Sequence, residues 1–415
     1  MKILLTAIGT RGDVEPFLAI GALLKAQGHE VVFLFPEQFK ELAGKDPFVG
    51  YTPKFLALIE SKEGKAFIGN SSLWTKIRAL RFMYKEGMKV NKEMVLQQFE
   101  TVKSQQPDLI VYHPKCNYPL LWGLRTQNKT VMVSPVPYVI HRVKGSAHVG
   151  FGNNRGLLNK LTYRIANFGL VKTLYDSQKM VAEGPRFSKA TIRKALLKEK
   201  LVYAVSPSLF ARPKEWKKNV RVLGYFEKPS SPDWKSSPEL DAFLTRHKQV
   251  IFLTFGSMVN SYPEKISKLI YETLNELGYA TLVNTAAGGL VPLSTYESNP
   301  NFFFTRQIPY DWVLPRVSAI IHHGGSGTTH RGLKYGCPTL LVPHIMDQYK
   351  WNELIAQRGL GPKGISINKL KKSPLKRRVQ DLMTRPEYRL KAHQISEQMR
   401  KENGEEAFST FILDN

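Results

Sequence analysis

The sequence predicts an α/β protein built from two similar halves, each a doubly wound sheet of parallel strands with helices between them. Short apolar segments alternate with segments of helical periodicity over residues 1–206, and the same alternation returns after residue 247. A stretch rich in Pro, Ser and Lys separates the two series. The length of 415 residues agrees with two or three domains, since one domain takes about 150 residues.

The first half opens with a strand, a helix and a second strand. Lys2–Ala7 is short and apolar, Pro16–Gln27 has apolar residues at helical spacing, and Glu30–Phe35 is again apolar. Two more strands are expected at Leu109–Tyr112 and Thr130–Ser134, with a helix between them. These elements make up the first predicted domain.

Residues 207–246 are predicted to link the two domains, because prolines interrupt them repeatedly. The second domain, residues 247–393, continues the strand and helix pattern. Its strands are expected at Val250–Thr254, Ala280–Asn284, Asn301–Thr305, Ala319–His322 and Thr339–Val342.

The net charge is high and unevenly distributed. The chain carries 60 Lys and Arg against 34 Asp and Glu, a net charge of +26 at pH 7. Residues 51–200 hold 26 of the basic and 9 of the acidic residues, whereas residues 251–350 are nearly balanced. Such a field attracts polyanions, either nucleic acid or an anionic membrane face, although a high charge also serves solubility alone.

The composition excludes several classes of protein. Hydrophobic residues make up 42% of the chain and the mean hydropathy is −0.26, which does not match a disordered protein. No apolar run reaches the ~20 residues of a membrane-spanning helix, and the first residues lack a secretory pattern. Two cysteines, Cys116 and Cys337, cannot form a disulfide framework or a four-ligand zinc site. We therefore expect a cytoplasmic protein, or one peripheral to the inner face of the membrane.

A glycine-rich turn after an apolar strand carries the strongest local signal. Ala319–His322 runs into the segment HGGSGTT at residues 323–329, and a helix is expected at His330–Tyr335. The turn aims backbone N–H groups and the positive end of a helix dipole at its ligand, and the hydroxyls add donors. A diphosphate fits this chemistry, with His323 as a further donor or positive charge. A capped turn alone explains the Gly and Thr residues but not the paired histidines.

Two further turns lie at the carboxyl ends of strands, where α/β sheets place their ligands. Asp347 and Gln348 follow the last predicted strand, and a carboxylate beside an amide suits vicinal sugar hydroxyls. Taken alone, a helix N-cap is the better explanation of Asp347. Gly256 and Ser257 follow the first strand of the second half and offer another turn of backbone donors.

The first turn of the chain, residues 9–16 with the sequence GTRGDVEP, holds a candidate general base. Asp13 stands at the mouth of the amino-terminal sheet, where a carboxylate can take a proton from a bound substrate. The same side chain can cap the helix that is expected to start near Pro16, and both roles remain open.

Together these four elements resemble the GT-B nucleotide-sugar glycosyltransferases, in the branch that contains the sterol glucosyltransferases and the natural-product glycosyltransferases. The resemblance spans essentially the whole chain. Residues 9–16 match the amino-terminal signature, and residues 322–329 with Asp347 and Gln348 match the donor signature. The resemblance implies two Rossmann-like domains that face a central cleft, with the acceptor bound by the first domain and the donor by the second. It also implies that the closing helix, residues 394–415, crosses back to the first domain.

The resemblance assigns a role to each matching residue. Asp13 is the base that deprotonates the acceptor. The other residues are, in the amino-terminal loop, Thr10, Arg11 and Gly12; for the donor diphosphate, His323, Gly325, Ser326, Gly327, Thr328, Gly256 and Ser257; for the sugar, Asp347 and Gln348; and for the nucleobase, Gln307 and Ile308. Plant relatives often have a tryptophan where Gln307 stands, so backbone pairing from Ile308 is expected rather than base stacking.

His113, directly after the strand Leu109–Tyr112, raises a further hypothesis. Many plant relatives use a histidine base in the first turn, oriented by an acidic residue after a later strand. Here the order is reversed, and His113 would tune or assist Asp13. A satisfied structural histidine is the alternative.

The resemblance implies a single inverting displacement at the anomeric carbon, without a metal or other cofactor. The sequence agrees on the metal, because no two aspartates stand two residues apart, as the Asp-x-Asp metal sites of other sugar transferases require. A hexose is expected to be transferred, with UDP-glucose as donor and a dTDP-sugar as the runner-up. The expected acceptor is a lipophilic alcohol of sterol-like, terpenoid, carotenoid or polyketide type.

Two segments of the first domain combine apolar and basic residues. Leu73–Lys92 carries Lys and Arg between apolar residues at helical spacing, and Leu157–Leu174 adds apolar surface with a few basic residues. Such a helix is typical of a membrane interface. A helix packed on the core with a solvated basic face explains the pattern equally well.

Other function classes compete with a sugar transferase. A basic protein that binds nucleic acid or membrane without catalysis would explain the charge, but no recognisable nucleic-acid module accompanies it, so nucleic acid is not an expected partner. A nucleotide-sugar epimerase would share the fold and the diphosphate site, and it would need no acceptor.

Overall fold

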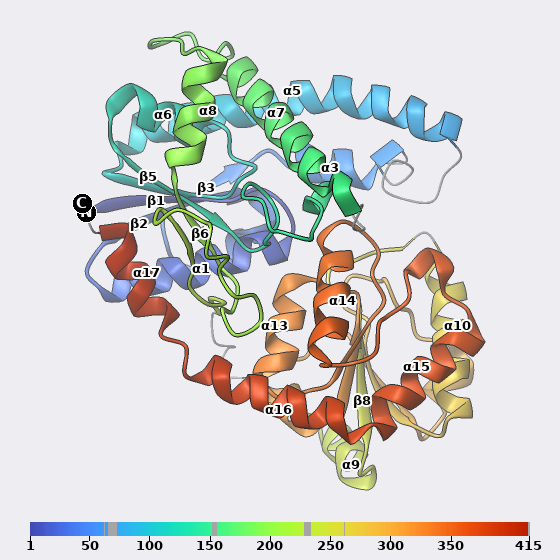
Figure 1. The fold of residues 1–415 in the computed structure, drawn as a ribbon. Helices are drawn as coiled ribbons and strands as arrows, with labels where there is room; N and C mark the ends of the chain where they lie inside the picture. The colour runs from blue at the N-terminus through green and yellow to red at the C-terminus, as the bar shows by residue number, and fades with distance from the viewer. Residues whose placement is uncertain (62, 65–72, 152–155, 228–233, 261, 414–415) are drawn as a thin grey trace. The chain divides into compact units, whose positions relative to one another are not determined.

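The computed structural model describes residues 1–415 except 62, 65–72, 152–155, 228–233, 261 and 414–415, and it leaves undescribed the side chains of residues 56, 59, 60, 73–77, 79, 80 and 84. The chain divides into two compact units, residues 1–228 with 403–415, and residues 229–402. Each unit contains one parallel sheet with helices around it (Figure 1). The predicted class, α/β with two parallel sheets, is confirmed. Among the described residues, none of the helices has the length and hydropathy needed to cross a bilayer.

Seven parallel strands form the sheet of the first unit. They are β1 (Lys2–Thr6), β2 (Glu30–Pro36), β3 (Phe48–Tyr51), β4 (Leu109–Tyr112), β5 (Lys129–Ser134), β6 (Lys200–Tyr203) and β7 (Val220–Val222). Their order in the sheet is β3-β2-β1-β4-β5-β6-β7. The order reverses between β1 and β4, where Thr6 and Tyr112 are register partners. Ligands of open α/β sheets bind at such a switch point.

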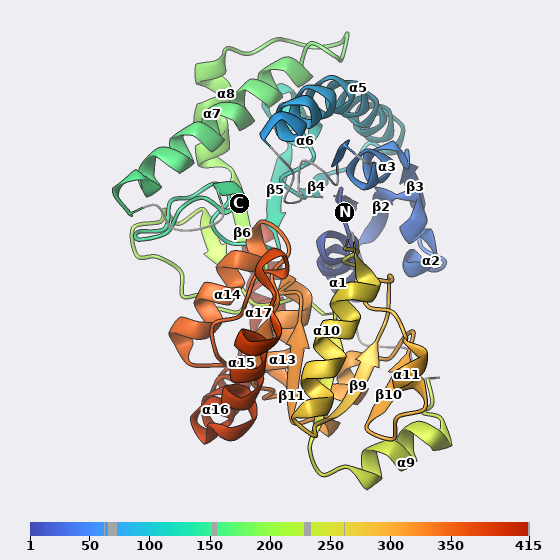
Figure 2. The ribbon, with the colours of Figure 1, turned by 90° about the vertical axis from the view of Figure 1, so that its right-hand side faces the viewer.

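Helices cover both faces of this sheet. They are α1 (Arg11–Ala26), α2 (Lys40–Ala43), α3 (Lys54–Glu60), α5 (Leu73–Gln105), α6 (Tyr118–Thr126), α7 (Asn159–Ser177), α8 (Lys189–Lys198) and α17 (Gly404–Leu413). Figures 1 and 2 show α1 and α17 on one face and α5, α6, α7 and α8 on the other. Both faces of the sheet are therefore buried at its central strands, as the apolar sequences of these strands require.

α1 begins five residues before the predicted start at Pro16. Thr10 is its N-cap, and Asp13 accepts a hydrogen bond from the backbone N–H of Thr10 at 2.8 Å in a capping box. This capping stabilises a first turn whose residues are mostly exposed. Apolar periodicity does not reveal such a turn, because its residues cap the helix instead of packing on the core.

α17 completes the core of the first unit. Phe408 and Ile412 are fully buried among the strands and α1, and the Phe408 ring lies 5.1 Å from that of Phe226. The sequence predicted one closing helix over 394–415. The structure has two helices in this region, α16 (Pro386–Arg400) in the second unit and α17 in the first.

The second unit has a sheet of five parallel strands in the order β10-β9-β8-β11-β12. The strands are β8 (Val250–Thr254), β9 (Ala280–Asn284), β10 (Phe302–Thr305), β11 (Ala319–His322) and β12 (Thr339–Leu341). The helices are α9 (Pro238–Arg246), α10 (Pro263–Glu276), α11 (Ser294–Glu297), α12 (Tyr310–Val313), α13 (Ser326–Lys334), α14 (Asp347–Arg358), α15 (Lys372–Thr384) and α16. One face of the sheet packs on α10 and α15, and the other on α9 and α12.

Residues 207–246, predicted as a linker, divide between the two units. β7 pairs with β6 at the edge of the first sheet, and α9 begins at a Ser237 cap that is followed by Pro238. β7 has three residues, too few for a strand pattern to be recognised in the sequence. Pro238 is the first residue of α9, a position where Pro favours a helix. The prolines therefore mark the starts and ends of short elements as well as a connection.

Candidate active site

The loops after β1 and β4 bring Asp13 and His113 together. Because the two strands are neighbours in register, residues that follow them meet at the carboxyl edge of the sheet. The Nε2 atom of His113 lies 3.2 Å from Oδ1 of Asp13. The pair named in the sequence analysis is thus in direct contact at the switch point of the first unit.

Four donors surround the Asp13 carboxylate, whose side chain is only 15% exposed. Oδ2 accepts hydrogen bonds from the backbone N–H and the hydroxyl of Thr10, at 2.8 and 3.1 Å. Oδ1 faces His113 and the ammonium of Lys115, which lies 3.1 Å away. Burial acts to raise the pKa of the Asp13 carboxyl, but Lys115 and His113 outweigh it and hold that pKa well below its usual range. Asp13 is therefore ionised at neutral pH.

His113 is a neutral, fully engaged imidazole. Its Nδ1 accepts a hydrogen bond from the backbone N–H of Lys115 at 3.2 Å, so the ring proton sits on Nε2 and points at Asp13. Burial lowers the pKa of His113 more than Asp13 raises it. With both nitrogens occupied, the ring is placed to orient Asp13 and offers no lone pair to a third group.

The rest of the first turn supports the Asp13 carboxylate. Thr10 caps α1, and Arg11 forms an ion pair with Glu15 at 2.6 Å and is half exposed. Gly9 has φ of +143°, and a Cβ at this position would lie 2.1 Å from Oδ2 of Asp13. Only glycine fits there. Gly12 has open space around it, with only the Thr10 hydroxyl nearby.

The glycine-rich turn of the second unit is the N-terminus of α13. The helix begins at Ser326 with Gly325 as its N-cap, four residues before the start predicted at His330. Ser326, Gly327 and Thr328 are therefore its first three residues, and their N–H groups point out of the amino-terminal end of the helix. This arrangement is favourable for an anion.

His323 packs against two glycines of this region. A Cβ on Gly256 would lie 3.1 Å from its Cε1 atom, and one on Gly325 would lie 2.4 Å from its Nε2 atom. Among the residues that the structure describes, the buried Nδ1 atom has no hydrogen-bond partner. Burial, and then the neighbouring His322 and His344, hold the pKa of His323 well below its usual value. At neutral pH His323 can thus act as a donor but not as the positive charge that the sequence analysis also allowed.

Asp347 and Gln348 open α14, next to the carboxyl end of β12. Asp347 is the first helical residue, and the N-cap is Met346, so the N-cap role considered for Asp347 does not apply. The amide oxygen of Gln348 accepts hydrogen bonds from the backbone N–H groups of His344 and Ile345, at 2.7 and 3.1 Å. Gln348 is buried and holds the loop together, which leaves its NH₂ group as the polar end for other partners.

The remaining predicted donor residues follow β8 and β10. Gly256, which Phe255 separates from β8, has φ of +54°, and its N–H donates to the Thr254 hydroxyl at 3.1 Å. Ser257 follows in the same turn. After β10, Gln307 is exposed, whereas the Ile308 side chain belongs to the core. Among the described residues of both units, no group of three His, Cys, Asp or Glu side chains is placed to hold a metal ion.

Comparisons with known proteins cover both units. Residues 3–113 match the glycosyltransferase family 28 N-terminal domain, and residues 296–406 match the erythromycin biosynthesis protein CIII-like C-terminal domain. Two solved structures share the fold over 99% of this chain and 98% of theirs. They are CalG4, the calicheamicin glycosyltransferase (15% identity, TM-score 0.70), and the glycosyltransferase SnogD from Streptomyces nogalater (18%, 0.66). The chain belongs to the GT-B glycosyltransferases.

Curated relatives of this GT-B chain include sterol and macrolide enzymes. The sterol 3-beta-glucosyltransferase UGT80A2 of Arabidopsis thaliana is 27% identical over 97% of this chain and 64% of its own length. The O-mycaminosyltylonolide 6-deoxyallosyltransferase of Streptomyces fradiae is 26% identical over 98% of this chain and 95% of its own. The chain therefore spans about two thirds of the plant relative and nearly all of the bacterial one.

Sequence reasoning missed three residues of these GT-B sites. Lys115 contacts Asp13, but nothing in the sequence distinguishes it from the other basic residues. Gly9 lies within the signature turn, yet its steric role appears only in the structure. Met346 has φ of +37°, a conformation that favours glycine, and its side chain is exposed beside Asp347. No sequence signal marks that strain.

Proposed function

We propose that the chain transfers a hexose from a nucleotide diphosphate sugar to a hydroxyl of a lipophilic acceptor, with inversion at the anomeric carbon. The observation that carries the proposal is the N-terminus of α13, where Ser326, Gly327 and Thr328 present successive N–H groups beside the neutral donor His323. A diphosphate that leaves in the transition state gains negative charge, which such donors stabilise. The names of the sterol and macrolide relatives support a lipophilic acceptor.

Asp13 is the proposed general base, and His113 is its positioning residue. An acceptor hydroxyl is a weak nucleophile, so the carboxylate must take its proton as the glycosidic bond forms. Both Asp13 oxygens are engaged in the structure, and of the two side chains at Oδ1, Lys115 is 45% exposed and His113 only 6%. Lys115 therefore has to withdraw before the acceptor hydroxyl can reach Oδ1.

In this proposal, separate groups of residues bind the diphosphate and the sugar of the donor. Ser326 to Thr328 hold the diphosphate, and the NH₂ group of Gln348 with the Asp347 carboxylate orients the sugar hydroxyls. UDP-glucose is the first donor to test. A dTDP-sugar is the second, because a similar structure, SsfS6, was solved with thymidine diphosphate (TM-score 0.65, 17% identity). The mechanism needs no metal, since the N–H groups supply the charge stabilisation.

The outer face of α7 supports contact with a membrane or with the acceptor itself. Three of its exposed side chains are large and apolar, Leu161, Ile165 and Phe168, and so are two of the preceding turn, Leu157 and Leu158. Exposed basic side chains accompany them: Lys160, Arg164 and Lys172. This combination is typical of a helix that lies in an anionic interface. We include peripheral binding to an anionic bilayer in the proposed function.

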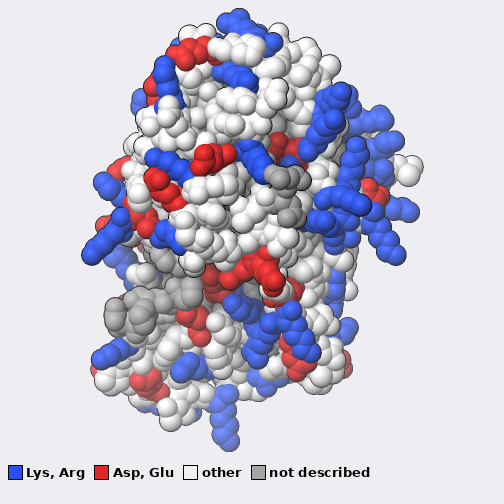
Figure 3. Space-filling model, turned by 90° about the vertical axis from the view of Figure 1, so that its left-hand side faces the viewer, with Lys and Arg blue, Asp and Glu red and all other residues white. Residues whose placement is uncertain are grey.

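The α5 part of the predicted basic surface is described only in part. The side chains of Trp74, Lys76, Ile77, Leu80 and Tyr84 lie outside the described residues. The described ones include Phe82, which is exposed, and the exposed basic residues Arg78, Arg81, Lys85, Lys89 and Lys92. Figure 3 shows the left-hand side of Figure 1, away from the right-hand end of α5, and there too Lys and Arg side chains gather along one edge with few acidic ones among them.

A donor panel tests the proposal. UDP-glucose and dTDP-glucose are incubated with a pool of lipophilic alcohols, with and without a chelator, and products are identified by mass spectrometry. We expect nucleotide release coupled to a glycoside of inverted configuration, unaffected by the chelator. Asp13→Asn should lower the rate about 10²- to 10⁴-fold while UDP binding is retained. Interconversion of the free sugar nucleotide, or full activity of D13N, would overturn the proposal.

A further inference from the structure

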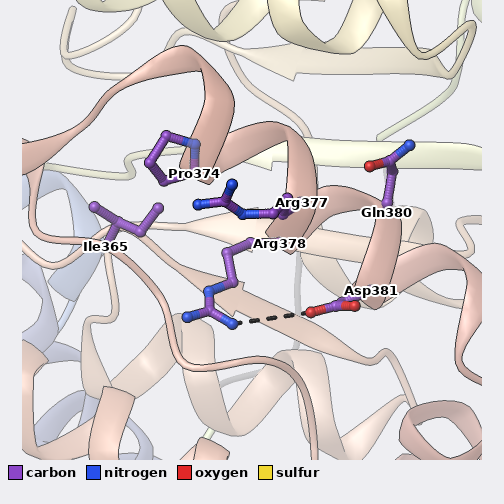
Figure 4. A pocket seen from close by; sticks show the side chains of 6 residues that line it. All are labelled: Ile365, Pro374, Arg377, Arg378, Gln380 and Asp381. Carbon is purple, nitrogen blue, oxygen red and sulfur yellow. Dashed lines mark ion pairs between the residues drawn. The ribbon is translucent and has the colours of Figure 1, made fainter.

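A pocket of about 260 Å³ opens on α15 in the second unit. α15 buries Leu375, Val379 and Leu382 in the core, so the residues on its other side line the pocket. The lining residues are Ile365, Pro374, Arg377, Arg378, Gln380 and Asp381. Figure 4 shows the Arg377 and Arg378 side chains extending from the helix on the same side, toward Ile365 and Pro374.

Positive charge at this pocket exceeds negative charge. Asp381 is its one lining carboxylate, and it is shared between Arg378 at 3.8 Å and Arg385 at 3.3 Å. Arg377 has no ion pair among the described residues and is exposed. The nearby lysines are balanced elsewhere, since Lys372 and Lys376 both pair with Glu276. The Arg377 and Arg378 guanidinium groups therefore share the pocket with one carboxylate, Asp381, which also pairs with Arg385.

Hydrogen bonds hold the segment with Ile365, which forms the other wall of the pocket, in place. Gly364 exchanges two hydrogen bonds with the Asn352 side chain, at 2.7 and 3.2 Å. The N–H of Ile367 donates to the carbonyl of Pro343 at 3.0 Å. Ile365 therefore stands on a fixed segment, and the pocket exists without a ligand to form it.

We propose that this pocket binds the phosphate group of an organic phosphate. Guanidinium groups bind phosphate oxygens in paired hydrogen bonds, and two adjacent arginines match a doubly charged phosphomonoester. The amide of Gln380 adds a donor, while Ile365 and Pro374 offer apolar contact to the carbon part. A soluble phosphate ester and the headgroup of an anionic lipid share this chemistry. None of the lining residues belongs to the proposed donor site.

The test titrates glycerol 3-phosphate into the full chain by calorimetry and, in parallel, measures sedimentation with phosphatidic acid vesicles. Arg377→Gln with Arg378→Gln should weaken binding at least tenfold. Arg389→Gln with Arg400→Gln removes the same charge from exposed positions on α16 and should leave binding unchanged. The single variant R377Q breaks no ion pair of the described residues, and a thermal melt that matches the wild type separates its weaker binding from lost folding.

The outcomes distinguish a soluble phosphate ester from a lipid headgroup, and this pocket from the donor turn. Loss of glycerol 3-phosphate binding in the double variant identifies a soluble ester, and loss of vesicle binding alone identifies a lipid headgroup. If phosphate binds at the donor turn instead, Thr328→Val should weaken its binding and the arginine substitutions should not. That result would overturn the inference. Equal binding by the wild type and both double variants, or no binding of either probe, would overturn it as well. Sugar transfer is not measured, so failure of the proposed function leaves this test intact.

Discussion

The Asp13 carboxylate serves the helix and the proposed chemistry at once. Its Oδ2 atom belongs to the capping box of α1, whereas its Oδ1 atom faces His113 and Lys115. Because the two oxygens have separate partners, the structural and catalytic roles that the sequence left open do not exclude each other. At Oδ1, the Lys115 contact is made by a long side chain that is 45% exposed, whereas His113 is buried.

Substitution of Lys115 tests whether its ammonium depresses the pKa of the base. Lys115→Met removes the largest influence that lowers the Asp13 pKa, so that pKa should rise toward its usual range. Asp13 acts as a base only when ionised, that is, above its pKa. The acidic limb of the kcat/KM profile should therefore move to higher pH in K115M, measured from pH 2 to 7, a window that includes the usual pKa of an Asp side chain, about 4. Lys198→Met, an exposed lysine of α8, is the control, and an unmoved limb in K115M would contradict the expectation.

Gly325→Ala tests the contact between the donor turn and His323. The new Cβ would lie 2.4 Å from Nε2 of His323, so the ring or the turn has to shift. We expect UDP affinity to fall at least tenfold, measured by calorimetry. Gly169→Ala in α7 places its methyl in open space and should bind UDP as the wild type does. Unchanged affinity in G325A would argue that nucleotide binds elsewhere.

At the residue scale, the sequence could predict those contacts that depend only on which strands are neighbours in the sheet. Asp13 and His113 follow adjacent parallel strands, so their encounter could be predicted from the order of the strands. The Lys115 contact and the backbone of Met346 depend on side-chain and loop conformations that composition and periodicity do not encode. The protonation of His323 also depended on burial, which only the fold determines.

At the scale of elements, α7 is apolar on both sides. Its inner side buries Tyr163, Val171 and Leu174, while the outer side leaves Ile165 and Phe168 half or more exposed. A group of exposed apolar side chains on one helix face marks a site of interaction. The outer face of α7 is therefore the element that most needs a partner in the proposed function.

Two acidic substitutions on that face test the partner. Ile165→Glu with Phe168→Glu should reduce sedimentation with anionic phosphatidylglycerol vesicles at least tenfold at low salt. The two changes remove apolar contact and add like charge. Leu197→Glu with Leu390→Glu makes the same change at exposed positions on α8 and α16 and serves as the control. Equal binding of all variants, or equal binding to neutral vesicles, would count against a membrane interface.

Element boundaries were predicted less well than the elements themselves. α1 and α13 both start earlier than apolar periodicity indicates, since their first turns consist of capping residues at Thr10 and Gly325. β7 was missed because three residues give no pattern, and only pairing with β6 identifies it. The prolines that suggested a linker are compatible with both a connection and the start of α9.

At the scale of the whole molecule, the two parallel sheets could be predicted because each is a regular alternation of strand and helix. The path of the chain after α16 could not be derived from periodicity, and the family resemblance supplied it. α17 belongs to the first unit, where Gln27 donates to the Ser409 hydroxyl at 2.7 Å and Phe408 is fully buried. The first unit therefore consists of two segments of chain.

Phe408→Ala tests that dependence. Removing a buried Phe side chain costs about 3–5 kcal/mol, and here the cost should fall on the first unit. Hydrogen exchange followed by mass spectrometry should show faster exchange in β1 and unchanged exchange in β8. Ile412→Val, a smaller deletion in the same core, should have a weaker effect of about 1 kcal/mol. Equal acceleration in both sheets would mean that the units unfold together.

The position of α17 has a consequence for synthesis on the ribosome. Nascent chains generally fold domain by domain as they emerge. The second unit is complete once residue 402 has left the exit tunnel, whereas the first unit still lacks Phe408 and Ile412. The half that is translated first is thus the last to close its core, and until then its apolar surface under α17 is open to chaperones.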